Sequence, residues 1–262
     1  IGVSTVHGTK IGVASSSDGI RWLYRGTLPN LEYEPGMNTF WAPEVIYAKG
    51  KYHMFVSYVR GVPTDWNWER HIIHYTADNM WEWKFESVLS LSSDRVIDAC
   101  IYEISPGIYK MWYKDEVNGS HTYSAISDDL YNWKILGPEI TDVPHEGPNV
   151  FELGGIKWLI TDHWHGLGVY SSDDFSSWTR KKDILDIPGK RKWDNAVGHH
   201  ADVVVCGDEA YIFYFTHPDA ENTPAECGLR ACVQVARLTT DGVNIFCDRD
   251  EEFELKIDKA AI

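Results

Sequence analysis

Short apolar stretches alternate with polar turns along the chain, and they come in pairs. An apolar stretch, a turn containing Gly or Asp, and a second stretch rich in aromatic residues recur at residues 45–47 and 52–55, 101–102 and 109–112, 150–151 and 158–160, and 203–205 and 211–213. Apolar runs of this length, bounded by turn residues, predict β-hairpins. No stretch carries the 3.6-residue period of a helix, so we expect an all-β protein with no helix longer than about two turns.

A second repeat follows the first and consists of a polar turn that leads into a tryptophan. Its copies are residues 17–22, 77–83, 127–133 and 172–178, with a weaker one at 240–245. The Asp or Asn of each turn can close the turn on its own backbone. Two hairpins repeated at intervals of tens of residues are typical of propeller blades. We therefore predict a single domain over residues 1–262, a five-bladed β-propeller whose first blade is incomplete at the N-terminus.

The innermost strands of a propeller line its axis, so residues just before the inner apolar stretches are candidates for a central site. In three of the repeats, counting back four residues from Val45, Val150 and Val204 gives Trp41, Glu146 and His200. The remaining repeat offers Asp98, which is one residue out of that register. A slip of one residue turns a side chain to the other face of the strand unless a β-bulge intervenes.

Charge narrows the classes of partner. Asp and Glu number 39 against 24 Lys and Arg, a formal net charge of −15. Phosphate backbones repel such a chain, so nucleic acid is excluded as a partner and a neutral or cationic ligand is favoured. The 12 Trp and 14 Tyr residues suit both strands and stacking on sugar rings. No apolar run approaches the roughly 18 residues of a membrane span, and no signal segment opens the sequence.

The cysteines favour neither a disulfide framework nor a zinc site, because they are odd in number and show no CxxC spacing. We expect buried free thiols at all five positions, Cys100, Cys206, Cys227, Cys232 and Cys247.

Three motifs resemble the blade-opening motifs of glycoside hydrolase family 43 and its clan, and the resemblance extends at blade level over nearly the whole chain. They are Phe40-Trp41-Ala42-Pro43-Glu44-Val45, Val96-Ile97-Asp98 and His145-Glu146-Gly147-Pro148. The resemblance implies an inverting glycosidase for neutral plant- or algal-type glycans, such as those containing arabinose or xylose. By motif, Glu146 resembles the general acid and Asp98 the carboxylate that tunes it. His200, with His199 as the competing choice, resembles an axial histidine beside a calcium ion; no cofactor is required.

Further residues near these motifs are candidates for sugar binding. They are Phe40, Trp41, His145, His163, Trp164, His165 and His199. Each candidate has a structural alternative, because a surface Glu146, a backbone-satisfied Asp98, a core Trp41 and a core pair of His200 with Asp202 would look the same in sequence. The loop at residues 162–166 is equally compatible with an ordinary exposed turn.

The general base is missing from its expected place. The resemblance puts an Asp on the first inner strand, upstream of Trp41, where the only acids are Asp18, Glu32 and Glu34. Asp18 falls in an outer turn and the two glutamates fall in a crossover, and Glu44 matches a family position that is not catalytic. We expect that the first inner strands, with the base, are lacking from this sequence; the alternative is a divergent member without efficient hydrolysis.

Other functions remain open at this point. The missing base favours a non-catalytic glycan-binding propeller. A sialidase-like enzyme would need an arginine cluster, which Arg95, Arg191 and Arg230 do not form in any recognisable motif. His145 beside Glu146 leaves room for an enzyme similar to family 117, in which a histidine has been proposed as the acid. A scaffold for protein partners would require an axis filled by apolar side chains.

Overall fold

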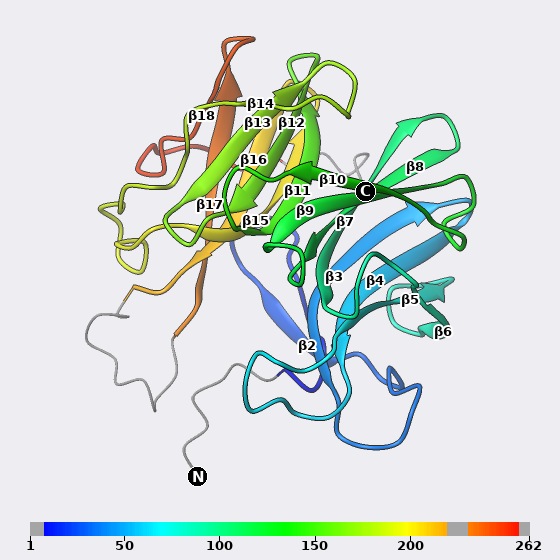
Figure 1. Ribbon diagram of the computed structural model, residues 1–262. Helices are drawn as coiled ribbons and strands as arrows, with labels where there is room; N and C mark the ends of the chain where they lie inside the picture. The colour runs from blue at the N-terminus through cyan, green and yellow to red at the C-terminus, as the bar shows by residue number, and fades with distance from the viewer. Residues whose placement is uncertain (1–7, 219–229, 257–262) are drawn as a thin grey trace. The chain divides into compact units, whose positions relative to one another are not determined.

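Every regular element that the computed structural model describes is a β-strand. The structure describes residues 8–218 and 230–256, and within these ranges it contains eighteen strands and no helix. The strands form four four-stranded antiparallel sheets and one two-stranded sheet (Figure 1). Each four-stranded sheet is built from strands consecutive in sequence, which is the construction of a propeller blade. The predicted all-β propeller class is confirmed. Nothing in the described ranges is a helix that could cross a membrane.

Contacts divide the chain into two compact units. Among the described residues, the N-terminal unit comprises 8–17 and 21–142, and the C-terminal unit comprises 143–218 and 230–256 together with 18–20. Each unit is described by itself below. The assignment of residues 1–262 to one domain stays a prediction.

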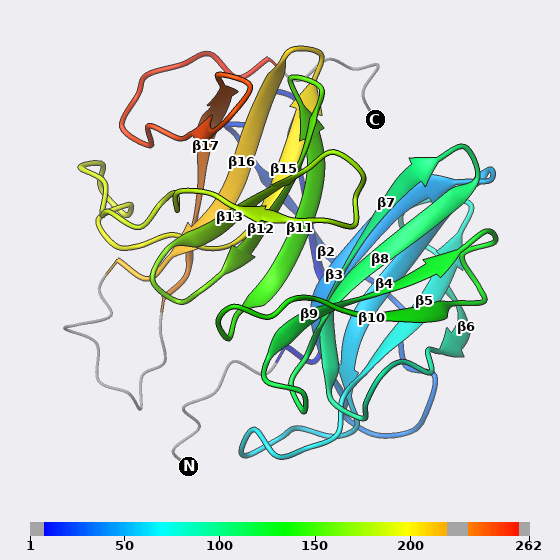
Figure 2. The ribbon, with the colours of Figure 1, turned by 45° about the horizontal axis from the view of Figure 1, so that its top comes forward.

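The N-terminal unit holds the two-stranded sheet and two complete blades. Figure 2 shows β7 to β10 as neighbours. The strands are β1 (Gly12–Ser15) and β2 (Leu23–Thr27); β3 (Thr39–Ala48), β4 (Lys51–Val59), β5 (His71–Ala77) and β6 (Lys84–Val88); β7 (Val96–Ser105), β8 (Ile108–Asp115), β9 (His121–Ser127) and β10 (Lys134–Ile140). Two clusters of buried side chains fill this unit, one centred on Met111 and Tyr113, the other on Met54 and Tyr75.

The C-terminal unit holds the other two blades. Their strands are β11 (Glu146–Leu153), β12 (Ile156–Asp162), β13 (Leu167–Ser172) and β14 (Thr179–Arg180); β15 (His199–Cys206), β16 (Glu209–Thr216), β17 (Cys232–Thr240) and β18 (Ile245–Phe246). One continuous cluster, which includes Trp158, Ile160, Ile212 and Tyr214, packs the two sheets together. All four predicted inner hairpins are confirmed by β3–β4, β7–β8, β11–β12 and β15–β16.

The outer turns close as the sequence predicted. Asp129 Oδ1 accepts hydrogen bonds from the backbone N–H groups of the residues two and three positions further on, at 2.8 and 2.7 Å. Asp174 and Asp241 do the same in their own turns. The tryptophans that follow differ, because Trp83 is buried whereas Trp22 is 56% exposed.

The cysteines in the described ranges are all free, but they are not equally buried. Only Cys100 is buried, and Cys206, Cys232 and Cys247 are partly exposed, because they lie near strand ends or after the last strand. The expectation of full burial is therefore wrong for these three. Cys227 lies outside the described residues.

Candidate active site

A β-bulge interrupts every inner strand at the same place, and it fixes which residues are equivalent. The register shifts between Trp41 and Glu44 in β3, and between Glu146 and Asn149 in β11. The matching shifts lie between Ile97 and Cys100 in β7 and between His199 and Asp202 in β15. The last paired residue before each bulge is therefore Trp41, Ile97, Glu146 or His199. Register thus places His199, not His200, at the position of Glu146, which corrects the count made from the sequence.

The second position of the bulge is held by Asp98 in β7, and its backbone is unusual. Asp98 has φ 59°, Gly147 at the same position of β11 has φ 58°, and Ala42 in β3 has φ 43°. Residues other than glycine rarely adopt this left-handed conformation, although Asp and Asn tolerate it best. The bulge thus explains why Asp98 lies one residue out of register with Glu146.

A neighbouring inner strand packs closely on the Glu146-Gly147-Pro148 motif. A Cβ atom on Gly147 would lie 2.6 Å from Cδ2 of the His200 ring. Glycine is needed at this point for two reasons, the positive φ and the space that the imidazole occupies. The His200 ring is therefore held directly beside the residue that follows Glu146.

Asp162, the last residue of β12, organises the site in the C-terminal unit. It is the register partner of Glu146 and is 1% exposed. Its Oδ2 accepts a hydrogen bond from the backbone N–H of His200 at 2.9 Å and lies 3.2 Å from His199 Nδ1. Its Oδ1 accepts from the backbone N–H of Trp164 at 2.6 Å. One buried carboxylate therefore fixes the start of β15 and the loop after β12.

The charge of Asp162 is stabilised by these donors. Burial by itself raises the pKa of the carboxyl, but the hydrogen bonds from His199 and from the backbone of His200 and Trp164 outweigh burial, and the net pKa is lowered. The ionised carboxylate in turn orients the His199 ring through Nδ1 and leaves its Nε2 atom for other partners.

Aromatic rings surround His199. Its ring stacks on Phe215 of β16, with centroids 5.4 Å apart, and lies at the same distance from the ring of His217. Phe215 is also the register partner of His199. The start of β15 and the end of β16 thus form an aromatic and imidazole surface next to Asp162.

The loop after β12 places its three aromatic residues differently. His163 folds back over β12 and β13. Its Nε2 atom lies 2.8 Å from Thr161 Oγ1 of β12, and its ring occupies the space beside Gly168 of β13. Trp164 is 40% exposed, with φ 62°, and His165 is exposed. His145 is fully buried, with Nδ1 2.8 Å from the Val143 carbonyl oxygen. The roles of these residues in sugar binding stay predictions.

The structural alternative supposed a hydrogen-bonded core pair of His200 and Asp202, but the side chain that donates a hydrogen bond to Asp202 is Asn149. Asn149 Nδ2 donates to Asp202 Oδ1 at 2.8 Å, so the two residues just beyond the bulges of β11 and β15 join their strands. The imidazole of His200 packs against Gly147 instead.

The N-terminal unit contains a hydrogen bond equivalent to the one between Asp162 and the backbone of His200, made by different residues. Ser57, the register partner of Trp41, accepts a hydrogen bond on Oγ from the backbone N–H of Asp98 at 2.9 Å. Ser57 therefore accepts a hydrogen bond from the backbone N–H of Asp98, as Asp162 accepts one from the backbone N–H of His200. The Asp98 side chain is 5% exposed, so this carboxyl is buried within its own unit.

The remaining residues of the first motif are engaged locally. The ring of Trp41 is half-buried and lies 6.0 Å from the Trp66 ring. Phe40 is 3% exposed and packs edge-on against Tyr58 within a core cluster, so its ring serves as core here. Glu44 Oε1 accepts from the backbone N–H of Ile101 at 2.9 Å, which ties β3 to β7. A sugar contact by Phe40 or Trp41 stays a prediction.

A metal ion finds little support among the described side chains. Within residues 8–218 and 230–256, no three His, Cys, Asp or Glu side chains are placed to bind one ion together. The carboxylate oxygen beside the backbone of His200, Asp162 Oδ2, already accepts hydrogen bonds from that backbone N–H and from His199. The residues described do not fit a protein-built calcium cage, and no step of the mechanism below uses one.

The residue that the sequence did not reveal as part of the site is Asp162. It was visible only as the start of a loop, because its partners lie 37 and 38 positions away, at His199 and His200. Phe215 and His217 were hidden for the same reason. The pairing register of the inner hairpins could have found two of them, since Asp162 lies opposite Glu146 and Phe215 lies opposite His199.

Comparison with known proteins supports the fold. No protein-family model matches the sequence, and no curated protein matches it. Among solved structures, a thermostable family-43 glycoside hydrolase is similar over 97% of this chain and 91% of its own, with a TM-score of 0.72 and 18% identity. An endo-1,4-beta-xylanase from Bacteroides thetaiotaomicron covers 93% of this chain and 87% of its own, with a TM-score of 0.73 and 20% identity.

An exo-1,5-alpha-L-arabinanase from a bovine ruminal metagenomic library is similar too, over 94% of this chain and 92% of its own, with a TM-score of 0.67 and 14% identity. At these identities the likeness establishes the fold, which is that of the propeller glycosidases.

Proposed function

We propose that the protein is an inverting glycoside hydrolase for neutral glycans that contain arabinose or xylose, with Glu146 as its general acid. The observation that carries the proposal is the pairing of Glu146 with Asp162, which gathers His199 and His200 at the same end of the blade. The names of the similar structures, a xylanase and an arabinanase among them, support the class of substrate.

In this mechanism Glu146 donates its proton to the departing glycosidic oxygen. Asp162 stays ionised and holds the His199 ring, whose free nitrogen and neighbouring Phe215 ring provide a polar and an aromatic contact for the sugar. A second carboxylate must activate water on the opposite face of the sugar, about 6.5–9.5 Å from the acid. The tuning role of Asp98 stays a prediction from its motif.

The general base is not assigned, and this favours a second candidate, a non-catalytic glycan-binding propeller. Two of the three acids upstream of Trp41, Asp18 and Glu34, are engaged in local contacts. Asp18 closes its own turn by accepting from the Ile20 N–H at 2.9 Å, and Glu34 accepts from the Tyr58 hydroxyl at 2.5 Å. Glu34 is also paired with Arg60.

The deciding experiment is Glu146→Gln, assayed on aryl glycosides of arabinose and xylose with good and with poor leaving groups. A general acid matters most where the departing oxygen is basic, so we expect a loss of about 10²–10⁴-fold on poor leaving groups and a much smaller loss on activated ones. The matched control is Glu152→Gln, an exposed glutamate on the same strand.

Equal losses on both classes of substrate would make Glu146 a binding residue. If the wild-type protein bound the oligosaccharides but cleaved none of them, the second candidate would replace the first.

A further inference from the structure

A basic segment stands out in the C-terminal unit of this acidic chain. Residues 190–192 read Lys-Arg-Lys and are followed directly by Trp193. They belong to the connection between β14 and β15, which leads into His199. The function proposed above uses none of these residues.

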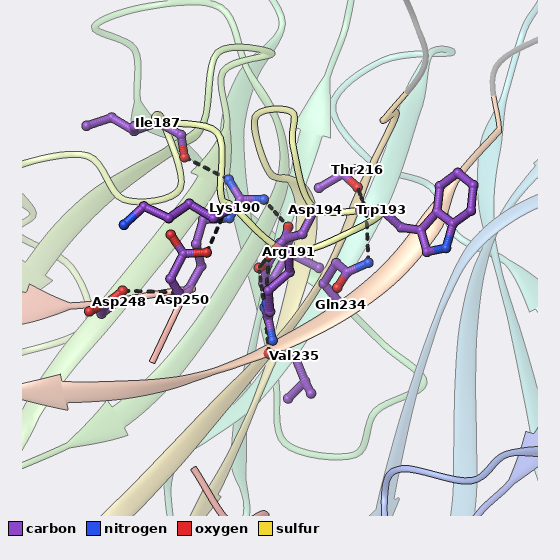
Figure 3. Close-up of polar contacts among 12 residues, drawn as sticks. Ile187, Lys190, Arg191, Trp193, Asp194, Thr216, Gln234, Val235, Asp248 and Asp250 are labelled. Carbon is purple, nitrogen blue, oxygen red and sulfur yellow. Dashed lines mark hydrogen bonds and ion pairs between the residues drawn. The ribbon is translucent and has the colours of Figure 1, made fainter. Parts of the chain in front are cut away.

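A buried ion-pair cluster anchors this connection. Asp194 is fully buried, and both Arg249 and Arg191 donate to its carboxylate, the second at 2.9 Å. The Tyr214 hydroxyl also donates to it, at 2.9 Å. Figure 3 shows Arg191 and Asp194 in contact beneath the segment. Trp193, the residue before Asp194, is therefore attached to a backbone position that buried ion pairs and a hydrogen bond hold in place.

Trp193 is presented outward from that base. Its carbonyl oxygen accepts hydrogen bonds from Thr216 Oγ1 at 2.7 Å and from Gln234 Nε2 at 2.9 Å. Its φ is 70°, a conformation that costs a tryptophan free energy, and its side chain is still 38% exposed. Figure 3 shows the indole pointing away from Asp194. Such strain at an exposed aromatic residue suggests a binding role.

Two cations lie over the same indole. Lys192 Nζ is 4.6 Å and Arg230 Cζ is 4.8 Å from the ring centroid. Neither side chain forms an ion pair with a residue in the described ranges, and the nearby Asp194 is engaged by Arg249 and Arg191. Two positive charges held at one ring repel each other, and an anion between them would remove that repulsion.

This patch adjoins the candidate active site. The carbonyl oxygen of Arg230 lies 3.0 Å from His217 Nδ1, and the His217 ring lies 5.4 Å from that of His199. His199, Thr216 and Gln234 all lie at one end of the sheet β15–β18, because β15 begins there and β16 ends there. A glycan at His199 could therefore extend to Trp193 along this end.

We propose that Lys192, Trp193 and Arg230 form an accessory subsite for a carboxylate-bearing sugar, a uronic acid residue of a glycan whose neutral part occupies the site at Glu146. The indole supplies a surface for the sugar ring, and the two cations supply charge-assisted hydrogen bonds to the carboxylate. The inference rests on the proposed function for its neighbouring sugar. The two positive charges at this subsite would let a chain of net negative charge bind an acidic branch.

The test measures binding by calorimetry in a Glu146→Gln background, which keeps the ligands intact. The probes are a xylo-oligosaccharide, the same oligosaccharide with one glucuronic acid branch, and the methyl ester of that branched compound. We expect the acid to bind about 5- to 10-fold more tightly than the other two at low salt, with the preference fading at about 1 M salt. Lys192→Gln with Arg230→Gln should abolish the preference, and Lys134→Gln, an exposed lysine of β10, should keep it.

Each outcome decides one of the two ideas. If the acid, the ester and the neutral compound bind alike, the subsite is refuted even where the wild-type protein hydrolyses aryl glycosides. A sulfated oligosaccharide that binds more tightly than the neutral compound, while the uronate shows no such preference, would also refute it. If the preference is present and depends on Lys192 and Arg230 but no hydrolysis occurs, the subsite stands and the proposed activity fails. If no compound binds, the subsite is refuted, and the hydrolysis of aryl glycosides by the wild-type protein decides the proposed activity separately.

Discussion

The imidazole of His200 occupies the space that a side chain on Gly147 would need, with Cδ2 only 2.6 Å from the position of a Cβ atom. This contact joins two neighbouring inner strands directly behind Glu146. Any side chain at residue 147 must displace the ring or the strand that carries Glu146, the proposed general acid.

Gly147→Ala should therefore impair activity beyond its effect on stability. The positive φ alone costs an alanine roughly 1–2 kcal/mol of folding free energy, and the clash with His200 adds a displacement of Glu146. We expect kcat/KM to fall about tenfold or more, since small misplacements of reacting groups are costly. The control is Gly155→Ala, which shares a positive φ of 75° but meets no atom within 4 Å. Equal activity in the two variants would contradict the prediction.

Asp162→Asn should destabilise the protein at neutral pH by about 1.5–3 kcal/mol, because hydrogen bonds from His199 and from two backbone N–H groups lose their charged acceptor. The pKa of Asp162 is lowered from its ordinary value of 3.8. The folded state thus binds this proton less readily than the unfolded state, and the stabilisation is complete above pH 3.8 and is lost as the pH falls below it.

The measurement is urea unfolding of both proteins from pH 7 down to pH 3. The gap between wild type and Asp162→Asn should be constant above about pH 5 and shrink towards the acidic end. Asp173→Asn, at an exposed position in the next turn, serves as the control. A gap that stays constant down to pH 3 would show that the charge of Asp162 contributes nothing.

A buried histidine pair in the N-terminal unit should make stability depend on pH near 6. His53 and His74 are fully buried, with His53 Nδ1 2.9 Å from His74 Nε2, and the His74 ring stacks on Phe55. Burial lowers the pKa of His74 to about 3. Below pH 6.5 the His74 side chain is therefore protonated in the unfolded chain but stays neutral in the folded chain. The free energy of unfolding consequently falls as the pH decreases below 6.5.

His74→Phe should flatten this dependence. One such histidine accounts for a loss of about 2.5 kcal/mol of unfolding free energy between pH 7 and pH 4.5, and phenylalanine keeps the stacking on Phe55. Urea midpoints at pH 7, 6, 5 and 4.5 provide the measurement, with the exposed His165→Gln as the control. An unchanged slope in His74→Phe would exclude the pair as its source.

The hairpins could be predicted because they depend on local chemistry. The apolar stretches at residues 150–151 and 158–160 and the turn acids at Asp129, Asp174 and Asp241 act on neighbours within a few positions. The burial of the tryptophans that follow these turns depends on contacts beyond the turn, so that Trp83 is buried and Trp22 is exposed.

The site was only half predictable. Glu146 and Asp98 are marked by motifs, but the bulge that separates their registers depends on a φ of 59° at Asp98, which no neighbouring residue encodes. Asp162 becomes a site residue only when β15 packs against β12, a contact between segments far apart in the sequence. The alternation of apolar and polar residues predicts the strands, whereas contacts between blades can be identified only once the three-dimensional structure is known.

The last prediction concerns the buried base of the segment that carries Trp193. Asp194→Asn leaves the Arg249 side chain, which is 6% exposed, without its charged partner and weakens the hold on Arg191. Breaking a buried pair on one side typically costs about 3–5 kcal/mol, because an uncompensated charge stays in a place of low polarity. Asp183→Asn is the matched control, since its pair with Arg180 is about one-third exposed and exposed pairs contribute about 0–1 kcal/mol. Urea unfolding should therefore separate the two variants clearly, and the fluorescence of the chain should change in Asp194→Asn before global unfolding, as the loop at Trp193 loosens. Equal stability of the two variants would mean that the cluster at Asp194 is replaceable by water, and the rigidity inferred for Trp193 would then have to come from Thr216 and Gln234 alone.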